Sequence, residues 1–70
     1  MTERSYQGVI VFYRADKGYG CVRVPDTREE FYFRAANLRQ PVRAGDRVRF
    51  VLKQDRRGFY ADHVELVLLG

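Results

Sequence analysis

The stretch Lys17-Gly-Tyr-Gly-Cys-Val22 carries the strongest indication of how this chain folds. Successive side chains of a β-strand point to opposite faces, so Lys17, Tyr19 and Cys21 would share one face. The two glycines and Val22 would share the other face, and glycine lets a sheet bend tightly where it lies. The stretch therefore predicts a curved strand that presents charged and aromatic side chains on one side.

Four more segments are also typical of β-strands, because they are rich in β-branched and aromatic residues. The five expected strands cover residues 6–13, 18–24, 30–34, 47–53 and 59–66, with turn residues between them. Residues 35–39 allow one helical turn, which Pro41 would stop from continuing. The sequence thus predicts one all-β domain over residues 1–70. We expect a five-stranded antiparallel barrel, closed or partly open, because closure protects the edges of a sheet.

Alternation along these strands divides their side chains between an interior and a surface. The expected core consists of Ile10, Val22, Val24, Phe31, Phe33, Val48, Phe50, Ala61 and Val64, with a contribution from Leu38. Tyr19 and Tyr32 fall on the opposite face, between Lys17, Arg23 and Arg34. The pattern predicts a surface on neighbouring strands that mixes aromatic rings with positive charge.

Composition and charge exclude several classes of protein. The 70 residues contain 13 basic and 9 acidic side chains, a net charge of +4, and 11 of the basic residues are arginine. One Cys and one His can build neither a disulfide framework nor a zinc site with four Cys or His ligands. No apolar run approaches the roughly 18 residues of a membrane span, and no signal-peptide core follows Met1. We expect a cytoplasmic protein with no cofactor, no membrane partner, no small-molecule substrate and no enzymatic activity.

Several segments resemble motifs of the cold-shock domain family, and they follow one another along the chain in the family's order. Residues 17–22 are similar to the first ribonucleoprotein motif, Lys-Gly-Phe-Gly-Phe-Ile, and residues 31–34 to the second, Val-Phe-Val-His. Residues 8–13, 36–38, 45–50 and 61–64 match further family patterns, so the resemblance covers residues 8–64. In an RNA-recognition motif domain the first motif follows a helix on the third strand, whereas only 16 residues precede it here. The resemblance implies an OB-fold barrel that binds single-stranded RNA or DNA in the manner of an RNA chaperone.

The resemblance also implies a set of binding residues. Aromatic rings would stack on bases, while arginine and lysine would contact phosphates or stack as well. Phe12 has the same parity as Ile10, so a local bulge is needed to bring it to the surface. The expected nucleic-acid-binding residues are Phe12, Tyr13, Arg14, Lys17, Tyr19, Arg23, Tyr32 and Arg34.

The chain departs from the family pattern at several binding positions. Phe12 replaces a tryptophan, and Cys21 and Ala35 stand where the family carries aromatic residues, so at least two stacking positions are lost. We expect weaker affinity or a different base preference, and we expect Cys21 to be a semi-exposed thiol without a special role. The alternative function is an OB-type protein-interaction or self-association module that forms a weak homodimer. The loss of platform aromatics and the apolar residues 64–69 both favour this alternative.

Overall fold

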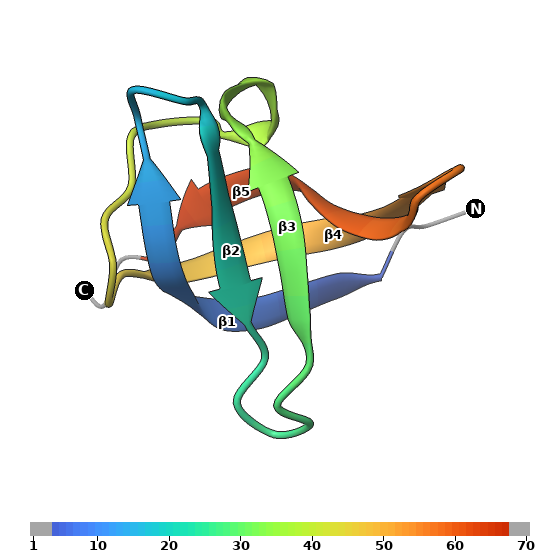
Figure 1. Cartoon of the computed structure of the whole chain (residues 1–70). Helices are drawn as coiled ribbons and strands as arrows, with labels where there is room; N and C mark the ends of the chain where they lie inside the picture. The colour runs from blue at the N-terminus through green and yellow to red at the C-terminus, as the bar shows by residue number, and fades with distance from the viewer. Residues whose placement is uncertain (1–3, 68–70) are drawn as a thin grey trace.

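Five β-strands make up nearly all of the regular structure, in a computed structural model that describes residues 4–67 (Figure 1). The strands are β1 (Ser5–Arg14), β2 (Tyr19–Arg23), β3 (Glu30–Arg34), β4 (Arg47–Asp55) and β5 (Gly58–Leu66). A short 3-10 helix, η1 (Ala35–Asn37), follows β3 directly. The prediction of an all-β chain with five strands is confirmed. No helix in residues 4–67 is long and apolar enough to span a membrane.

All neighbouring strands are antiparallel, in the order β3-β2-β1-β4-β5, so β1 lies at the centre of the sheet. The first half of β1 pairs with β4, from Ser5 opposite Val51 to Val9 opposite Arg47. The second half pairs with β2, from Val9 opposite Arg23 to Arg14 opposite Tyr19. Because β1 bends between these halves, β2 and β3 cross over β4 and β5 and enclose the core (Figure 1).

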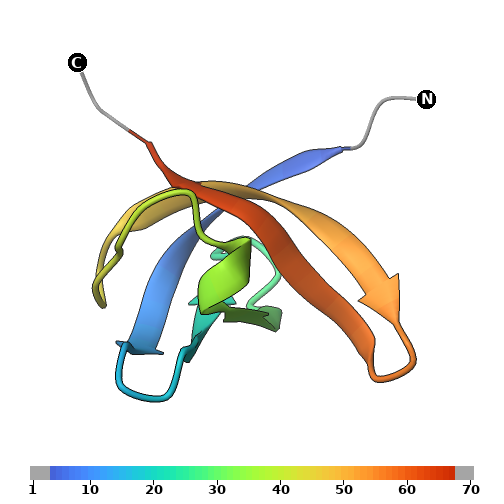
Figure 2. The same cartoon turned by 90° about the horizontal axis from the view of Figure 1, so that it is seen from above.

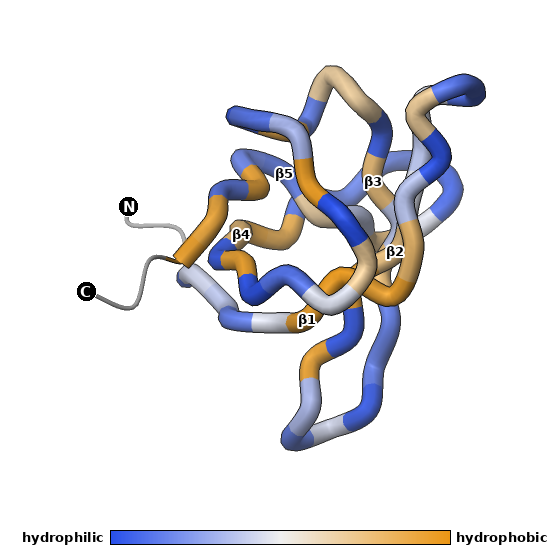
Figure 3. The backbone as a smooth tube through the Cα atoms, turned by 90° about the vertical axis from the view of Figure 1, so that its left-hand side faces the viewer, coloured by the Kyte–Doolittle hydropathy of each residue, from blue (hydrophilic) through white to orange (hydrophobic). Residues whose placement is uncertain are grey.

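The core lies between these two parts of the sheet. Hydrophobic and hydrophilic residues alternate along the backbone (Figure 3), as strands with one buried face require. Seven of the expected core residues are buried: Ile10, Val22, Phe33, Val48, Phe50, Ala61 and Val64. Val24, Phe31 and Leu38 are only partly buried and pack against this cluster. Val42 completes the core from the loop before β4, where the alternation of a strand gives no information.

A bulge in β1 sets which side chains reach the surface. Ile10 pairs with Val22 and Phe12 pairs with Cys21, so Val11 is the extra residue on β1. The extra residue shifts the alternation, so Ile10 points into the core while Phe12 lies on the opposite face. The bulge that an outward-facing Phe12 requires is therefore present.

The sheet does not close into a barrel. Among residues 4–67 no ladder joins β3 to β5, so of the two forms expected, a closed or a partly open barrel, the closed one is not observed. The segment after β3 occupies the gap instead: Asn37 Nδ2 donates to Asp62 Oδ1 at 2.9 Å, and the backbone N–H of Arg39 donates to the Val64 carbonyl at 2.8 Å. Viewed from above, η1 lies between β3 and β5 (Figure 2). One backbone carbonyl and one side chain of β5 are thus bonded by residues that follow β3.

Candidate nucleic-acid interface

Three aromatic side chains gather on the outer face of β1, β2 and β3. We call Phe12, Tyr19 and Tyr32 the aromatic face. The rings of Phe12 and Tyr19 meet edge to face, with centroids 5.8 Å apart and planes at 87°. Tyr32 lies on the next strand and is 63% exposed, while Tyr19 is 37% exposed and Phe12 is half-buried. The face therefore offers two accessible rings on neighbouring strands.

Cys21 lies at the centre of this face but does not reach its surface. Its backbone pairs with Phe12 on one side and Tyr32 on the other, and its short side chain is only 2% exposed. Burial raises the pKa of the Cys21 thiol, and the nearby Glu30 carboxylate, with Oε1 3.8 Å from the sulfur, raises it further. The expectation of a semi-exposed thiol is therefore wrong.

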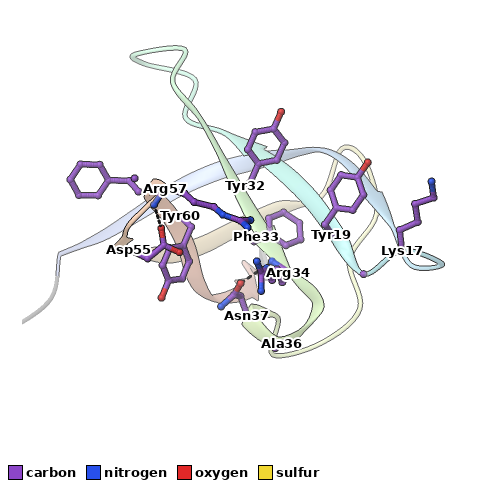
Figure 4. A pocket seen from close by; sticks show the side chains of 13 residues that line it. Lys17, Tyr19, Tyr32, Phe33, Arg34, Ala36, Asn37, Asp55, Arg57 and Tyr60 are labelled. Carbon is purple, nitrogen blue, oxygen red and sulfur yellow. Dashed lines mark hydrogen bonds between the residues drawn. The ribbon is translucent and has the colours of Figure 1, made fainter.

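A groove of about 730 Å³ begins at the aromatic face and runs to the hairpin between β4 and β5. One side carries residues of β2 and β3 with the turn before them: Lys17, Gly18, Tyr19, Tyr32, Phe33 and Arg34. The other side carries residues of η1 and the hairpin: Ala36, Asn37, Asp55, Arg57, Gly58, Phe59 and Tyr60. Figure 4 shows Lys17 at one end, then Tyr19, then Tyr32 and Arg34, with Arg57 and Asp55 at the other end.

Positive charge in the groove is largely uncompensated. Within residues 4–67, Lys17, Arg34 and Arg57 form no ion pair. Asp55 is the one carboxylate among the lining residues, and its Oδ1 accepts a hydrogen bond from the backbone N–H of Arg57 at 2.8 Å. Guanidinium groups bind phosphates through paired hydrogen bonds and stack on planar rings. An anionic ligand with planar groups would thus be complementary to the groove.

Four of the eight sequence-predicted binding residues do not line the groove: Phe12, Tyr13, Arg14 and Arg23. The ring of Tyr13 stacks on the buried Phe33, with centroids 5.9 Å apart, because the shifted alternation that turns Phe12 outward turns its neighbour inward. Arg14 pairs with Asp16 at 3.5 Å. Arg23 donates from Nε to Glu30 Oε2 at 2.9 Å. The structure therefore brings together Lys17, Tyr19, Tyr32 and Arg34 in the groove, with Phe12 beside them.

The hairpin residues of the groove are not among the residues expected from the sequence. Arg57, Phe59 and Tyr60 line it from β5 and from the turn before that strand. Phe59 is 58% exposed although it lies two residues from the buried Ala61, on the same face of β5. The sequence offered one signal for these residues, a phenylalanine next to two arginines in a turn. Whether that phenylalanine is buried or exposed depends on how far the hairpin extends past the core, and the alternation of side chains does not reveal this.

A second polar cluster lies where η1 meets β5. Burial acts to raise the pKa of Asp62, but hydrogen bonds from Asn37 Nδ2 and from the backbone N–H of His63, with the charges of His63 and Lys53, outweigh it and lower the pKa. Lys53 Nζ lies 3.8 Å from Asp62 Oδ2. The cluster connects η1 to β4 and β5, so it supports one wall of the groove.

Comparison with known proteins adds no relative: the chain matches no protein-family model, and no curated protein matches it. In residues 4–67, no group of three or more His, Cys, Asp or Glu side chains could hold a metal ion.

Proposed function

We propose that this chain is a single-stranded nucleic-acid-binding module of the OB-fold, cold-shock type, which keeps RNA or DNA strands unpaired as an RNA chaperone does. The observation that carries the proposal is the placement of Tyr19 and Tyr32, exposed on adjacent strands, with Lys17 and Arg34 in the same groove. Bases would stack on the two rings while the cations bind the phosphates between them.

The topology also supports this proposal. An OB-fold is a five-stranded, partly open barrel that binds oligonucleotides on its second and third strands. The order β3-β2-β1-β4-β5 would become a closed circle if β3 paired with β5. The helical turn of η1 lies between these two strands (Figure 2), and the aromatic face lies on β1, β2 and β3.

Titration of fluorescently labelled dT7 and U7 at two salt concentrations tests the proposal. Contacts from Lys17, Arg34 and Arg57 would release counterions with a log–log slope of about −2.1, at about 0.7 per contact on single strands. Affinity should then fall about 20-fold between 50 mM and 200 mM salt. A duplex of the same length should bind more weakly, since its bases are not available for stacking. Salt-independent binding to either strand, or no binding, would contradict the proposal.

Two matched pairs of variants locate the binding surface. Tyr32→Leu should weaken binding roughly 5-fold or more, whereas Tyr32→Phe, which keeps the ring, should retain most of it. Arg34→Gln should weaken binding and reduce the salt slope by about 0.7, because one phosphate contact is lost. Arg23→Gln removes the same charge from an arginine already paired with Glu30, so its effect on binding should be smaller.

A second candidate function is self-association through the open sheet. Within residues 4–67, β3 forms a ladder with β2 alone, and the unpaired edge of a strand can accept another chain. Of the apolar residues that suggested this alternative, Leu68 and Leu69 lie outside the described residues. Sedimentation equilibrium across a range of concentrations separates the two functions: a dimer without nucleotide-dependent NMR shifts at Tyr19 would favour self-association.

A further inference from the structure

The outer edge of β3 carries main-chain groups that base stacking does not use. In an antiparallel pair, every second residue exchanges hydrogen bonds with its neighbour, and the residues between direct their N–H and C=O the other way. The bonds between β2 and β3 continue past both ends of β3, through the Glu29 carbonyl and the Ala35 N–H. Counting by twos between these residues assigns the bonds to β2 to Phe31 and Phe33. The N–H and C=O groups that point to the open edge are therefore those of Glu30, Tyr32 and Arg34.

This edge is closed at one end and open along the rest. The N–H of Arg34 donates to Asn37 Oδ1 at 2.8 Å, where η1 begins. Among residues 4–67, β2 is the one strand that pairs with β3, so the outward groups of Glu30 and Tyr32 have no strand partner. The unpaired edge of a strand is a template on which the main chain of another segment can add.

The groove decides what kind of chain fits this edge. It reaches β3 at Tyr32, Phe33 and Arg34, and the hairpin between β4 and β5 lines it on the opposite side. A second copy would bring its own β2 along the other edge of its β3, into the space where the hairpin stands. A single extended segment needs the width of one strand, about 4.8 Å. One added strand therefore fits the groove better than an added sheet.

Charges along the edge select the side chains of the added strand. Arg34 and Arg57 form no ion pair within residues 4–67, and both line the groove. Figure 4 shows the side chain of Arg57 extending from the hairpin toward β3. A carboxylate opposite Arg34 would thus meet positive charge from both sides of the groove. At the other end of β3, Glu30 favours a basic residue opposite it.

We propose that the open edge of β3 binds an extended segment of a partner protein as an added antiparallel strand. Alternate residues of this segment are acidic opposite Arg34, neutral opposite Tyr32 and basic opposite Glu30. The residues between them are apolar, because they point to the same side as the buried Phe33. The added strand covers Tyr32 and Arg34, so it also competes with nucleic acid, and this consequence alone rests on the proposed function.

The blocked peptide Ac-Glu-Val-Thr-Val-Lys-NH2 is the probe, titrated into the isotopically labelled full chain and followed by NMR. It should shift the amide signals of Glu30 and Tyr32 in a saturable way. Methylation of its threonine nitrogen removes the N–H that pairs with Tyr32 and should weaken binding at least about fivefold. Methylation of the second valine nitrogen, which points away from β3, is the matched control and should change affinity less than about twofold.

Exchanging the glutamate and lysine of the peptide tests the charge selection. The exchange places like charges opposite each other at both ends of β3 and should weaken binding at least about threefold. Arg34→Glu should abolish this preference, because one end of the edge then favours each peptide. Arg56→Glu makes the same change of charge at a residue that does not line the groove and should leave the preference intact. Thermal melts check that both variants are folded.

Equal affinities for the four peptides would refute the added strand. If the Glu30 and Tyr32 signals shift with protein concentration when no peptide is present, a second copy occupies the edge and the proposal is also refuted. If dT7 shifts these signals and the peptide does not, the added strand is refuted while the proposed function stands. If the peptide binds and dT7 does not, the added strand is supported and the proposed function fails.

Discussion

Gly20 tests whether the glycines of the 17–22 stretch serve the core or the binding face. A Cβ atom added at Gly20 would lie 2.5 Å from the carbonyl oxygen of Phe12 and 2.6 Å from Cζ of Phe33. Both contacts are far shorter than van der Waals separation. The Phe12 oxygen belongs to the neighbouring strand, and the Phe33 ring is 1% exposed with Tyr13 stacked on it. Neither group can move without disturbing the ladder or the core.

We therefore expect Gly20→Ala to destabilise the fold by about 3 kcal/mol, the upper end of the usual cost of overpacking. Unfolding of 70 residues has an entropy of about 0.15 kcal/mol/K near 60 °C, so Tm should fall by about 20 °C. Far-UV circular dichroism melts and urea titrations measure both quantities. Gly45→Ala is the control: its Cβ meets nothing within 4 Å, so only the positive φ of 92° opposes it, at about 1–2 kcal/mol.

A second variant identifies the clash. Phe33→Leu shortens the side chain that the new methyl group meets, so it should cost less stability in the Gly20→Ala background than in the unchanged chain. The reasoning is wrong if Gly20→Ala lowers Tm by less than about 4 °C, which corresponds to about 0.6 kcal/mol here. It is also wrong if the variant keeps its stability and loses only oligonucleotide binding. The glycine would then serve the ligand and not the core.

Three further predictions concern Cys21, Asp62 and Tyr13. Cys21 should react with iodoacetamide at pH 8 at least about tenfold more slowly in the folded chain than in guanidinium, because burial excludes the reagent and raises the thiol pKa; equal rates would show that the thiol is accessible. The pKa of Asp62 is lowered on folding, so its carboxylate stabilises the fold above the unfolded value near 3.9, and this contribution disappears as pH falls through the folded value. The stability difference between the unchanged chain and Asp62→Asn should therefore shrink between pH 5 and pH 3 in urea titrations, and a difference that stays constant would contradict this account. Tyr13→Ala should cost about 3 kcal/mol of stability, since the ring packs on Phe33, while Tyr13→Phe should leave oligonucleotide affinity unchanged; a large loss of affinity in Tyr13→Phe would return this residue to the interface.

Much of the strand structure could be predicted because its causes are local. Residues 30–34 match β3 in both bounds, and the other expected strands lie within or overlap the observed ones. The bulge in β1 could also be anticipated from the family resemblance, which puts Phe12 on the surface although it has the same parity as the core residue Ile10. Side-chain alternation follows from backbone geometry alone, so it can be inferred before any contact is known.

The aromatic face and its surroundings were predicted less completely. Resemblance placed the adjacent residues Phe12 and Tyr13 together on the surface, but one bulge can turn only one of two neighbours outward. Arg23 was expected to be available for phosphate, yet Glu30 lies directly across the ladder and holds it. In both cases the outcome depends on which residue of another strand lies opposite, and that register is a property of the folded sheet.

The amino-acid sequence by itself determined the number of strands, most of the core and the mixed aromatic and cationic surface, because alternation and turn chemistry act over a few residues. Only the tertiary structure decided that the sheet stays open, that Cys21 is covered, and that Arg57 and Phe59 lie in the same groove as Tyr32. Each of these depends on the lengths and pairing of strands far apart in the chain. The pairing of β4 with β5 carries the hairpin past the core. For this reason Phe59, near the end of the chain, lines the same groove as Lys17.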